Sequence, residues 1–237
     1  MNLKRNTFKH LFFDLDHTLW DFERCSEETL EELYDIHRVD LLSKGSASKD
    51  HFIAAFRKIN AELWSHYNES RITKETIRDR RFPMMFELLN IPAAVCPANL
   101  GKEYLERCPK KPYLIPDTIE ALEHLQNKYY LHILTNGFAD VQSTKMRYSN
   151  IFHYFNSVVT SECTGHKKPS KEIFEFAMKQ AGAAADQSAM IGDNLNTDIV
   201  GANNAGMFSV YYNPDAVEHN EYVGAEIISL KELIELF

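Results

Sequence analysis

The C-terminal half of the chain, from about residue 112 onwards, alternates short apolar runs with longer segments of helical character. The apolar runs have the length of strands, and the segments between them carry apolar residues at helical spacing. Strands that alternate with helices predict a parallel sheet covered by helices on both faces. The expected strands are 130–134, 157–160, 189–191, 208–211 and 226–228, and the expected helices are 117–127, 139–149, 171–181, 197–205 and 230–237.

One more apolar run, 10–14, lies near the N-terminus and is too apolar to stand alone, so we expect it to join this sheet. The region between shows helical patterns and no convincing strand, with Pro83 expected to kink one helix or to start a new one. The predicted fold is an α/β, doubly wound parallel sheet formed by residues 1–17 and 112–237, with an all-helical domain, residues 18–111, inserted after the first strand. The expected helices of the insertion are 21–37, 50–67, 73–90 and 99–108, followed by a linker at 109–112.

The composition is that of a globular protein, with 237 residues, 44% of them hydrophobic, and a formal net charge of −8. This charge disfavours binding to a nucleic-acid polymer or an anionic membrane. The four cysteines form no CxxC pair and match no common zinc site. No apolar run is long enough to span a bilayer, and the positive start at 1–7 is not followed by a signal-peptide core. We therefore expect a cytoplasmic protein, either a monomer or a homodimer.

Two aspartates follow the first expected strand, in the stretch Phe12-Phe13-Asp14-Leu15-Asp16. Because side chains alternate along a strand, Asp14 and Asp16 point to the same side. Two carboxylates on one side repel each other, so a folded protein needs a reason to place them together. A divalent cation is one reason, and a shared task in phosphoryl transfer is another.

Polar residues also follow the other expected strands, and ligands bind beyond the carboxyl ends of the strands in open parallel sheets. Each of these motifs is common by itself in turns and helix caps. Their order along the chain and their shared place at successive strand ends make the combination specific. The motifs are Thr135-Asn136-Gly137, Lys168-Pro169, and Gly192-Asp193-Asn194 with Asp198.

The order of these motifs resembles that of the haloacid dehalogenase (HAD) superfamily, a large group made up mostly of phosphatases. The family pattern is Asp-x-Asp-x-Thr, a Ser or Thr after the second strand, a Lys, and Gly-Asp-x-x-x-x-Asp. Here these elements are Asp14-Leu15-Asp16-His17-Thr18, Thr135, Lys168, and the stretch from Gly192 to Asp198. The resemblance covers the whole predicted core, and the helical insertion lies where the family places its cap domain.

The resemblance implies a catalytic role for three residues. Asp14 would be the nucleophile and would form an aspartyl-phosphate. Asp16 would protonate the leaving group as a general acid and then activate water as a base. Lys168 would neutralise charge on Asp14 and the phosphoryl group. Lys167 competes for this last role, but Lys168 directly precedes the proline, as in the family pattern.

The resemblance also implies a phosphate site and a metal site. Thr135, with the backbone amides near Asn136 and Gly137, would hold phosphate oxygens. Mg²⁺ would be bound by the carboxylate of Asp14, the main-chain carbonyl of Asp16 and the carboxylate of Asp193. Further out, Asp198 and Asn194 would orient Lys168 or a metal-bound water.

The segment His17-Thr18-Leu19-Trp20-Asp21, together with Thr135-Asn136-Gly137-Phe138, resembles the bacterial pyrimidine 5′-nucleotidase-like phosphatases, although a glycine is commoner at His17. This implies a nucleoside monophosphate as the substrate, and Trp20 is a candidate surface on which a base could stack. The presence of Asp16 favours ester hydrolysis over dehalogenation, since a leaving halide needs no proton. The alternatives are a phosphatase of another small ester, such as a phosphoglycolate- or sugar-phosphate-like compound, a phosphomutase, or a phospho-aspartate signalling receiver.

Overall fold

The computed structural model describes residues 8–237, so the positive start at 1–7 lies outside the described residues. The chain forms two compact units. One unit comprises the described residues up to Phe22 together with Pro112–Phe237, and the other comprises Glu23–Lys111. We call them the sheet unit and the helical unit. Residues 18–22, which the sequence analysis assigned to the helical domain, group with the sheet unit.

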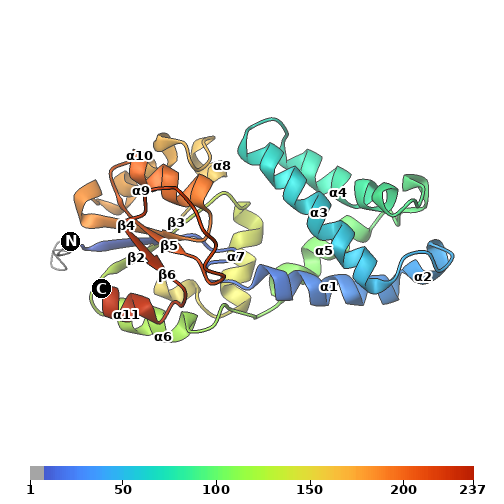
Figure 1. Ribbon diagram of the computed structural model, residues 1–237, viewed down its shortest axis with the longest axis horizontal. Coiled ribbons are helices and arrows are strands. Elements are labelled where there is room, and N and C mark those ends of the chain that lie inside the picture. Colours follow the sequence, from blue (N-terminus) through green and yellow to red (C-terminus); the bar gives the residue numbers. More distant parts are fainter. Residues whose placement is uncertain (1–7) are drawn as a thin grey trace. The chain divides into compact units, whose positions relative to one another are not determined.

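The sheet unit is built on six parallel strands in the order β3-β2-β1-β4-β5-β6 (Figure 1). This arrangement confirms the predicted doubly wound parallel sheet. After β3 the chain crosses to the other side of β1 to form β4, so the direction of winding reverses next to β1. Ligands bind in the crevice at such a switch point. The strands are β1 (His10–Phe13), β2 (Tyr130–Thr135), β3 (Ser157–Thr160), β4 (Ser188–Gly192), β5 (Phe208–Tyr212) and β6 (Ala225–Ile227).

Helices cover both faces of this sheet, with α9 (Lys171–Ala181) and α10 (Val200–Asn204) on one face and α6 (Thr118–Leu125) and α11 (Glu232–Leu236) on the other (Figure 1). The remaining helical segments of the unit are α7 (Ala139–Tyr148), α8 (Ser161–Thr164) and short 3₁₀ turns at Phe152–Tyr154 and Ala185–Gln187. The expected single helix 197–205 is wrong in detail, because it starts as a π-helical turn, Leu195–Ile199, and continues as α10.

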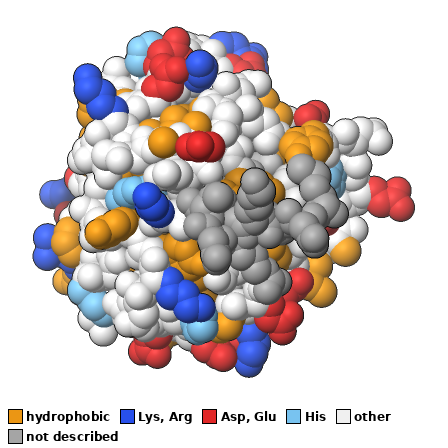
Figure 2. All heavy atoms as spheres, turned by 90° about the vertical axis from the view of Figure 1, so that its left-hand side faces the viewer, with side chains coloured by type: hydrophobic (Ala, Val, Ile, Leu, Met, Phe, Trp, Pro, Cys, Tyr) orange, Lys and Arg blue, Asp and Glu red, His pale blue; other side chains and the backbone are white. Residues whose placement is uncertain are grey.

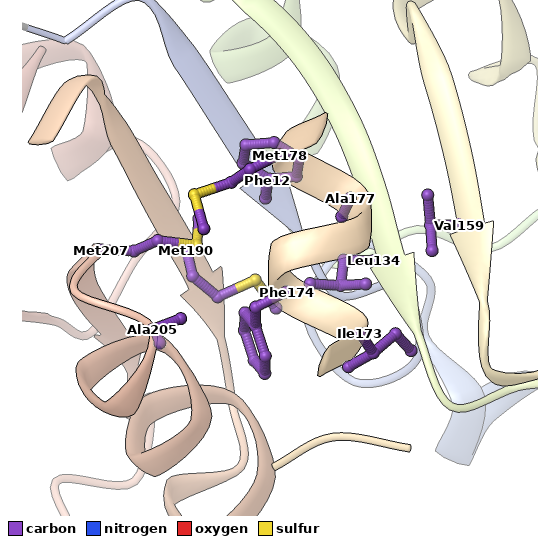
Figure 3. Packing of buried hydrophobic residues seen from close by; sticks show 11 residues of the cluster. Phe12, Leu134, Val159, Ile173, Phe174, Ala177, Met178, Met190, Ala205 and Met207 are labelled. Atoms are coloured by element: carbon purple, nitrogen blue, oxygen red, sulfur yellow. The ribbon is translucent and has the colours of Figure 1, made fainter. Parts of the chain in front are cut away.

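One hydrophobic cluster of the sheet unit lies between the strands and the helices α9 and α10 (Figure 3). Phe12, Leu134 and Met190 project from three neighbouring strands toward α9, which contributes Phe174 and Ala177. All five side chains are fully buried. Each large apolar side chain buried in this way stabilises the fold by about 1.5–3 kcal/mol, so the strand ends that carry the polar motifs rest on a rigid base.

Two histidines on the same face of the sheet form a buried hydrogen-bonded chain. The ring nitrogens His10 Nδ1 and His132 Nε2 lie 3.1 Å apart, and His132 Nδ1 lies 2.7 Å from Ser157 Oγ. The ring of His132 also stacks on Phe12 at 4.6 Å between ring centroids. Burial, with a smaller contribution from His10, lowers the pKa of His132 from 6.5 to about 4.

This histidine makes stability depend on pH. Above pH 6.5 His132 is neutral in the folded and the unfolded chain, but between pH 6.5 and about 4 only the unfolded chain takes up the proton. We expect the wild-type protein to lose about 2 kcal/mol more of its unfolding free energy over this window than His132→Gln does. Denaturant unfolding at pH 7 and pH 4.5 measures the difference, and equal pH dependence in the two proteins would contradict it.

The two passages of the chain between the units are paired with each other. Trp20 forms an antiparallel bridge with Leu114. The amide of Asp21 donates to the carbonyl of Tyr113 at 3.1 Å, and the amide of Ile115 donates to the carbonyl of Leu19 at 2.9 Å. The insertion therefore begins and ends at neighbouring points of the sheet unit.

Within the helical unit, the described residues 23–111 contain helices and turns but no strand, as predicted. Pro83 lies inside α4, which continues through the proline as one helix. Of the two expected outcomes, a new helix start at Pro83 is therefore wrong. The core of this unit is aromatic, with Phe52, Phe56, Phe82 and Phe86 buried. The helices are α1 (Phe22–Ile36), α2 (Val39–Leu42), α3 (Lys49–Asn68), α4 (Lys74–Leu88) and α5 (Leu100–Arg107), with 3₁₀ turns at Ala93–Val95 and Cys108–Lys110.

Acidic and basic side chains are interspersed on the face of the molecule shown in Figure 2. No helix within residues 8–237 combines the length and the apolar character that crossing a membrane requires.

Candidate active site

The predicted site residues meet at the carboxyl ends of β1, β2 and β4. Asp14 directly follows β1, Thr135 is the last residue of β2, and Asp193 directly follows β4. Lys168 reaches the same edge from the loop between α8 and α9. The site thus lies at the switch point of the sheet.

Lys168 is the cation at the centre of this cluster. Its Nζ lies 2.6 Å from Asp14 Oδ1 and 2.6 Å from Asp198 Oδ1, and it donates to the carbonyl of Leu134 at 2.9 Å. The side chain is only 2% exposed. Burial opposes its charge, but Asp14 and Asp198 raise the pKa of Lys168 above its ordinary value. Lys168 therefore stays protonated and bridges two carboxylates.

The acidic groups outnumber this cation. Asp14, Asp193 and Asp198 each offer a carboxylate oxygen within 4.8 Å of the others. Burial, opposed by Lys168 and reinforced by Asp198, raises the pKa of Asp14 to about 6. Burial and the nearby charge of Asp14 likewise raise the pKa of Asp193 to about 6. Three buried or half-buried carboxylates with one lysine form a site with an excess of negative charge, which a bound cation would relieve.

Thr18, the last residue of the Asp-x-Asp-x-Thr motif, holds Asp193 from two sides. Its Oγ1 donates to Asp193 Oδ1 at 2.9 Å and accepts from the amide of Asp193 at 3.1 Å. The loop that leads to Thr18 contains His17 with φ at +62°, a left-handed conformation that glycine adopts at no cost. This backbone explains why glycine is the commoner residue at the position of His17.

Asp16 is held by a second cation that the sequence analysis missed. Lys145 Nζ lies 2.5 Å from Asp16 Oδ1, and Gln142 Nε2 donates to Asp16 Oδ2 at 2.9 Å. Burial would raise the pKa of Asp16, but the charge of Lys145 and the hydrogen bonds from Lys145 and Gln142 outweigh it, so the pKa of Asp16 lies below its ordinary value. Asp14 and Asp16 thus have separate lysine partners.

The Thr-Asn-Gly motif is used mostly for internal support. Thr135 Oγ1 accepts hydrogen bonds from the amide of Gly137 at 3.1 Å and from Gln142 Nε2 at 2.9 Å. A hydroxyl has two acceptor lone pairs, so its own proton is left for a third group. A Cβ on Gly137 would lie 2.1 Å from Gln142 Nε2, so a larger residue here would displace the Gln142 side chain. The Gly137 amide, expected to face phosphate, already has this acceptor.

Asn136 holds the loop that carries the central lysine. Its Nδ2 donates to the carbonyl of Lys168 at 3.0 Å, and its Oδ1 accepts from the amide of Lys168 at 2.8 Å. The side chain therefore positions Lys168 through the backbone.

The last two predicted site residues, Asp198 and Asn194, have partners within the sheet unit. Asp198 is fully buried, with Oδ1 on Lys168 and Oδ2 accepting from the amide of Asn194 at 3.1 Å. Asn194 Oδ1 accepts from the amides of Asn196 and Thr197 and so begins the π-helical turn. The structure thus places Asp198 against Lys168 and gives the Asn194 side chain a capping role.

Trp20 does not have the surroundings of a stacking surface. Its side chain is fully buried, and Lys145 Nζ lies 4.5 Å from the centre of its ring. A base cannot stack on a ring that presents no surface, so the suggested contact between Trp20 and a base is not supported. Trp20 instead packs against the lysine that holds Asp16.

A parallel sheet with a lysine-bridged cluster of aspartates at its switch point places the chain among the α/β proteins whose ligand site lies at the carboxyl ends of the strands. Comparison with known proteins narrows this class. The chain belongs to the haloacid dehalogenase-like hydrolase family, whose model matches residues 8–206. This confirms the family that the motifs predicted.

Two relatives from bacteria match nearly the whole chain. Pyrimidine 5′-nucleotidase PynA of Streptococcus pneumoniae is 28% identical over 232 residues, which cover 96% of this chain and 94% of PynA. Pyrimidine 5′-nucleotidase YjjG of Escherichia coli is 28% identical over 230 residues, which cover 95% of this chain and 96% of YjjG. Among solved structures, the HAD-hydrolase YfnB of Bacillus subtilis bound to magnesium superposes with a TM-score of 0.86 at 28% identity, covering 97% of this chain and 98% of that chain.

Proposed function

We propose that this chain is a Mg²⁺-dependent phosphomonoester hydrolase that acts through an aspartyl-phosphate on Asp14, with a pyrimidine nucleoside 5′-monophosphate as its substrate. The observation that carries the reaction is the pairing of Asp14 with Lys168 at 2.6 Å beside Asp193, while Asp16 is held separately two residues further on. The nucleotide substrate is supported by the likeness to PynA and YjjG over nearly their full lengths.

The residues present fit a magnesium ion. Mg²⁺ prefers oxygen ligands, and Asp14 and Asp193 offer two carboxylates whose pKa values are raised by burial and, to a smaller extent, by neighbouring aspartates. The main-chain carbonyl of Asp16 completes the proposed set. Bound there, the ion would offset the negative charge of the phosphate group and of the carboxylates around it.

In the first half of the proposed reaction, the carboxylate of Asp14 attacks phosphorus. Each pair of unit negative charges at 4 Å costs about 4 kcal/mol at an effective dielectric of about 20. Lys168 lies on Asp14 and reduces this repulsion. The free proton of the Thr135 hydroxyl suits a phosphoryl oxygen. The bond from phosphorus to the leaving oxygen breaks, and that oxygen takes a proton from Asp16, which enters this half in its protonated form and leaves it as the carboxylate. The lowered pKa of Asp16 makes this protonated form the rarer one but a stronger proton donor.

In the second half, Asp16 takes a proton from water as the water attacks phosphorus. The bond between phosphorus and Asp14 then breaks, releasing phosphate and restoring the carboxylate. Lys145 favours the charged form of Asp16 that this half requires.

A panel of phosphate esters, assayed with and without EDTA, tests the proposal. We expect phosphate release from pyrimidine nucleoside monophosphates to exceed that from purine nucleotides, phosphoglycolate and sugar phosphates, and to stop when EDTA removes the metal. A preference for a sugar phosphate would contradict the proposed nucleotide substrate. Hydrolysis of none of the esters would contradict the proposed hydrolase activity as well. A phosphoenzyme that lasts far longer than seconds would favour the signalling receiver.

The metal site predicts a stability effect that does not depend on activity. The folded-state pKa values of Asp14 and Asp193 are raised from 3.8 to about 6, so their charges destabilise the metal-free fold increasingly as the pH rises through this window. At pH 7, Mg²⁺ at 100 times its Kd is expected to raise the Tm by about 5–10 °C. The shift should be smaller at pH 5, where protons compete with the ion.

The shift in Tm, measured by differential scanning fluorimetry, also shows in variants which residue binds the metal. Asp193→Asn keeps an acceptor for Thr18 but removes one buried charge, so its metal-free Tm should be at or above that of the wild type and its Mg²⁺ shift should vanish. Asp186 is exposed and lies before β4, at the opposite end of this strand from the acidic cluster. Asp186→Asn should therefore keep the full Mg²⁺-induced shift in Tm. An undiminished shift in Asp193→Asn would place the ion elsewhere.

A further inference from the structure

Both carboxylate oxygens of Asp16 are bound by side chains of one helix. Lys145 takes Oδ1 at 2.5 Å, and Gln142 takes Oδ2 at 2.9 Å. The two residues are three positions apart on α7 and therefore lie on the same side of that helix. Both are buried, although they are long polar residues. Burial of such side chains is costly unless their polar groups are used. Lys145 Nζ and Gln142 Nε2 both have partners, whereas Gln142 Oε1 has none among the described residues.

Lys145 is committed to Asp16. Among residues 8–237, Asp16 is the one carboxylate recorded within 4.0 Å of its ammonium group. The same ammonium lies 4.5 Å from the ring centre of Trp20 and 5.9 Å from that of Phe22, and aromatic faces attract a cation at such distances. Besides the carboxylate of Asp16, the lysine therefore has two aromatic rings as neighbours.

Asp16 needs such a hold because of where it lies. It follows β1 by three residues, in the turn between Leu15 and Trp20, and its side chain is 24% exposed. The carboxylate of an aspartate rotates over a broad range when nothing holds it. A group that must deliver a proton to one oxygen has to be held within about 0.5 Å of the productive place.

We infer that Lys145, assisted by Gln142, is a positioning residue that holds the carboxylate of Asp16 at the leaving oxygen of the ester. Gln142 Nε2 also donates to Thr135 Oγ1, so one amide sets the spacing between the acid and the hydroxyl that faces the phosphoryl group. Lys168 has a different task, since it pairs with Asp14 and Asp198. The inference rests on the proposed hydrolase function and names a device that serves it.

The test compares two esters whose leaving groups differ in their need for a proton. An alkyl phosphate releases an alkoxide, which must be protonated, whereas p-nitrophenyl phosphate releases a stable phenolate. The measured quantity is kcat/KM, which covers the steps up to departure of the leaving group. We expect Lys145→Met to lower kcat/KM about 10- to 100-fold with the alkyl phosphate that the wild type hydrolyses fastest, and by less than about threefold with p-nitrophenyl phosphate.

Two further variants separate positioning from a structural role. In an Asp16→Asn background, Lys145→Met should cause no further loss with the alkyl phosphate, because a residue that acts through Asp16 has nothing left to hold. Lys145→Arg, which keeps a cationic donor, should recover part of the loss. Lys179→Met, which removes an exposed lysine on α9, is the matched control and should leave both esters unaffected.

Equal losses with the two esters, no loss with the alkyl phosphate, or an additive loss in the Asp16→Asn background would overturn the inference. If Lys145→Met does not fold, Lys145→Gln is compared in the same way, since it keeps a donor and loses only the charge. A wild-type protein that hydrolyses neither ester contradicts the proposed function itself. A wild type that hydrolyses both, with variants that lose them equally, contradicts only the role of Lys145.

Discussion

Asp14→Asn is expected to lower kcat by at least about 10⁴-fold, because an amide cannot form the acyl-phosphate that the proposed reaction requires. The substitution changes one oxygen to nitrogen and leaves the size of the side chain unchanged. Lys168 keeps its partner Asp198, so the fold should persist. Phosphate release is the measurement, together with acid quenching of the reaction to trap phosphoprotein, which should be detectable in the wild type and absent in the variant.

The control for this experiment is Asp186→Asn, which makes the same chemical change at an exposed acid and should keep full activity. Circular dichroism and the Tm of both variants report whether the fold is intact. If Asp14→Asn retains near wild-type turnover, Asp14 is not the nucleophile and the proposed mechanism is wrong.

Lys168→Met is expected to have the largest effect on stability. The ammonium bridges Asp14 and Asp198 at 2.6 Å each in a site where the lysine is 2% exposed. Removing one partner of a buried ion pair costs about 3–5 kcal/mol, because the remaining charge is buried without compensation. Here two carboxylates lose their cation at once. Urea unfolding in EDTA at pH 7 measures the loss, and phosphatase activity should fall with it.

Lys167→Met is the matched comparison, because the neighbouring lysine is partly exposed and its replacement should change stability by less than about 1 kcal/mol. At pH 5 the deficit of Lys168→Met should shrink, since carboxylates without their cation bind protons more readily. A variant that is as stable as the wild type at pH 7 would show that Lys168 does not carry the charge balance of the site.

Most of the sheet unit could be predicted from the sequence because the inner parts of its central strands are buried and therefore mostly apolar. Short apolar runs such as 130–134 and 189–191 have the length of strands. The helices between them follow from the helical spacing of their apolar residues. The order of the strands in space was not readable from such runs. The π-helical turn at Leu195–Ile199 was missed because it depends on the Asn194 side chain capping two amides.

The site was predictable where residues directly follow strands, since the carboxyl ends of parallel strands meet at one edge. Asp14, Lys168 and Asp193 were found in this way or by their order along the chain. Lys145 was missed because it lies in a helix, 129 residues from Asp16 along the chain. A usable signal existed: Gln142 and Lys145 occupy the buried side of α7, where apolar residues are expected.

Other details depended on contacts that no spacing reveals. Asn136 was expected near the phosphate, but its side chain holds the backbone of Lys168. Trp20 was expected to offer a stacking surface, but its side chain is fully buried and Lys145 lies 4.5 Å from the centre of its ring. The residue types placed Asn136 and Trp20 near the site, but only the packing shows which groups their side chains contact.

The pairing of the two passages between the units has a consequence for how such a protein can be remodelled. Because Trp20 and Leu114 already lie in adjacent antiparallel segments, the ends of the insertion are as close as the ends of a β-hairpin loop. Hairpins are closed by loops of about two to five residues. The catalytic sheet therefore does not need the 89 residues of Glu23–Lys111 to complete its own chain path. We therefore expect that a different domain can be inserted at the same two points without a break in the strands that carry the candidate site.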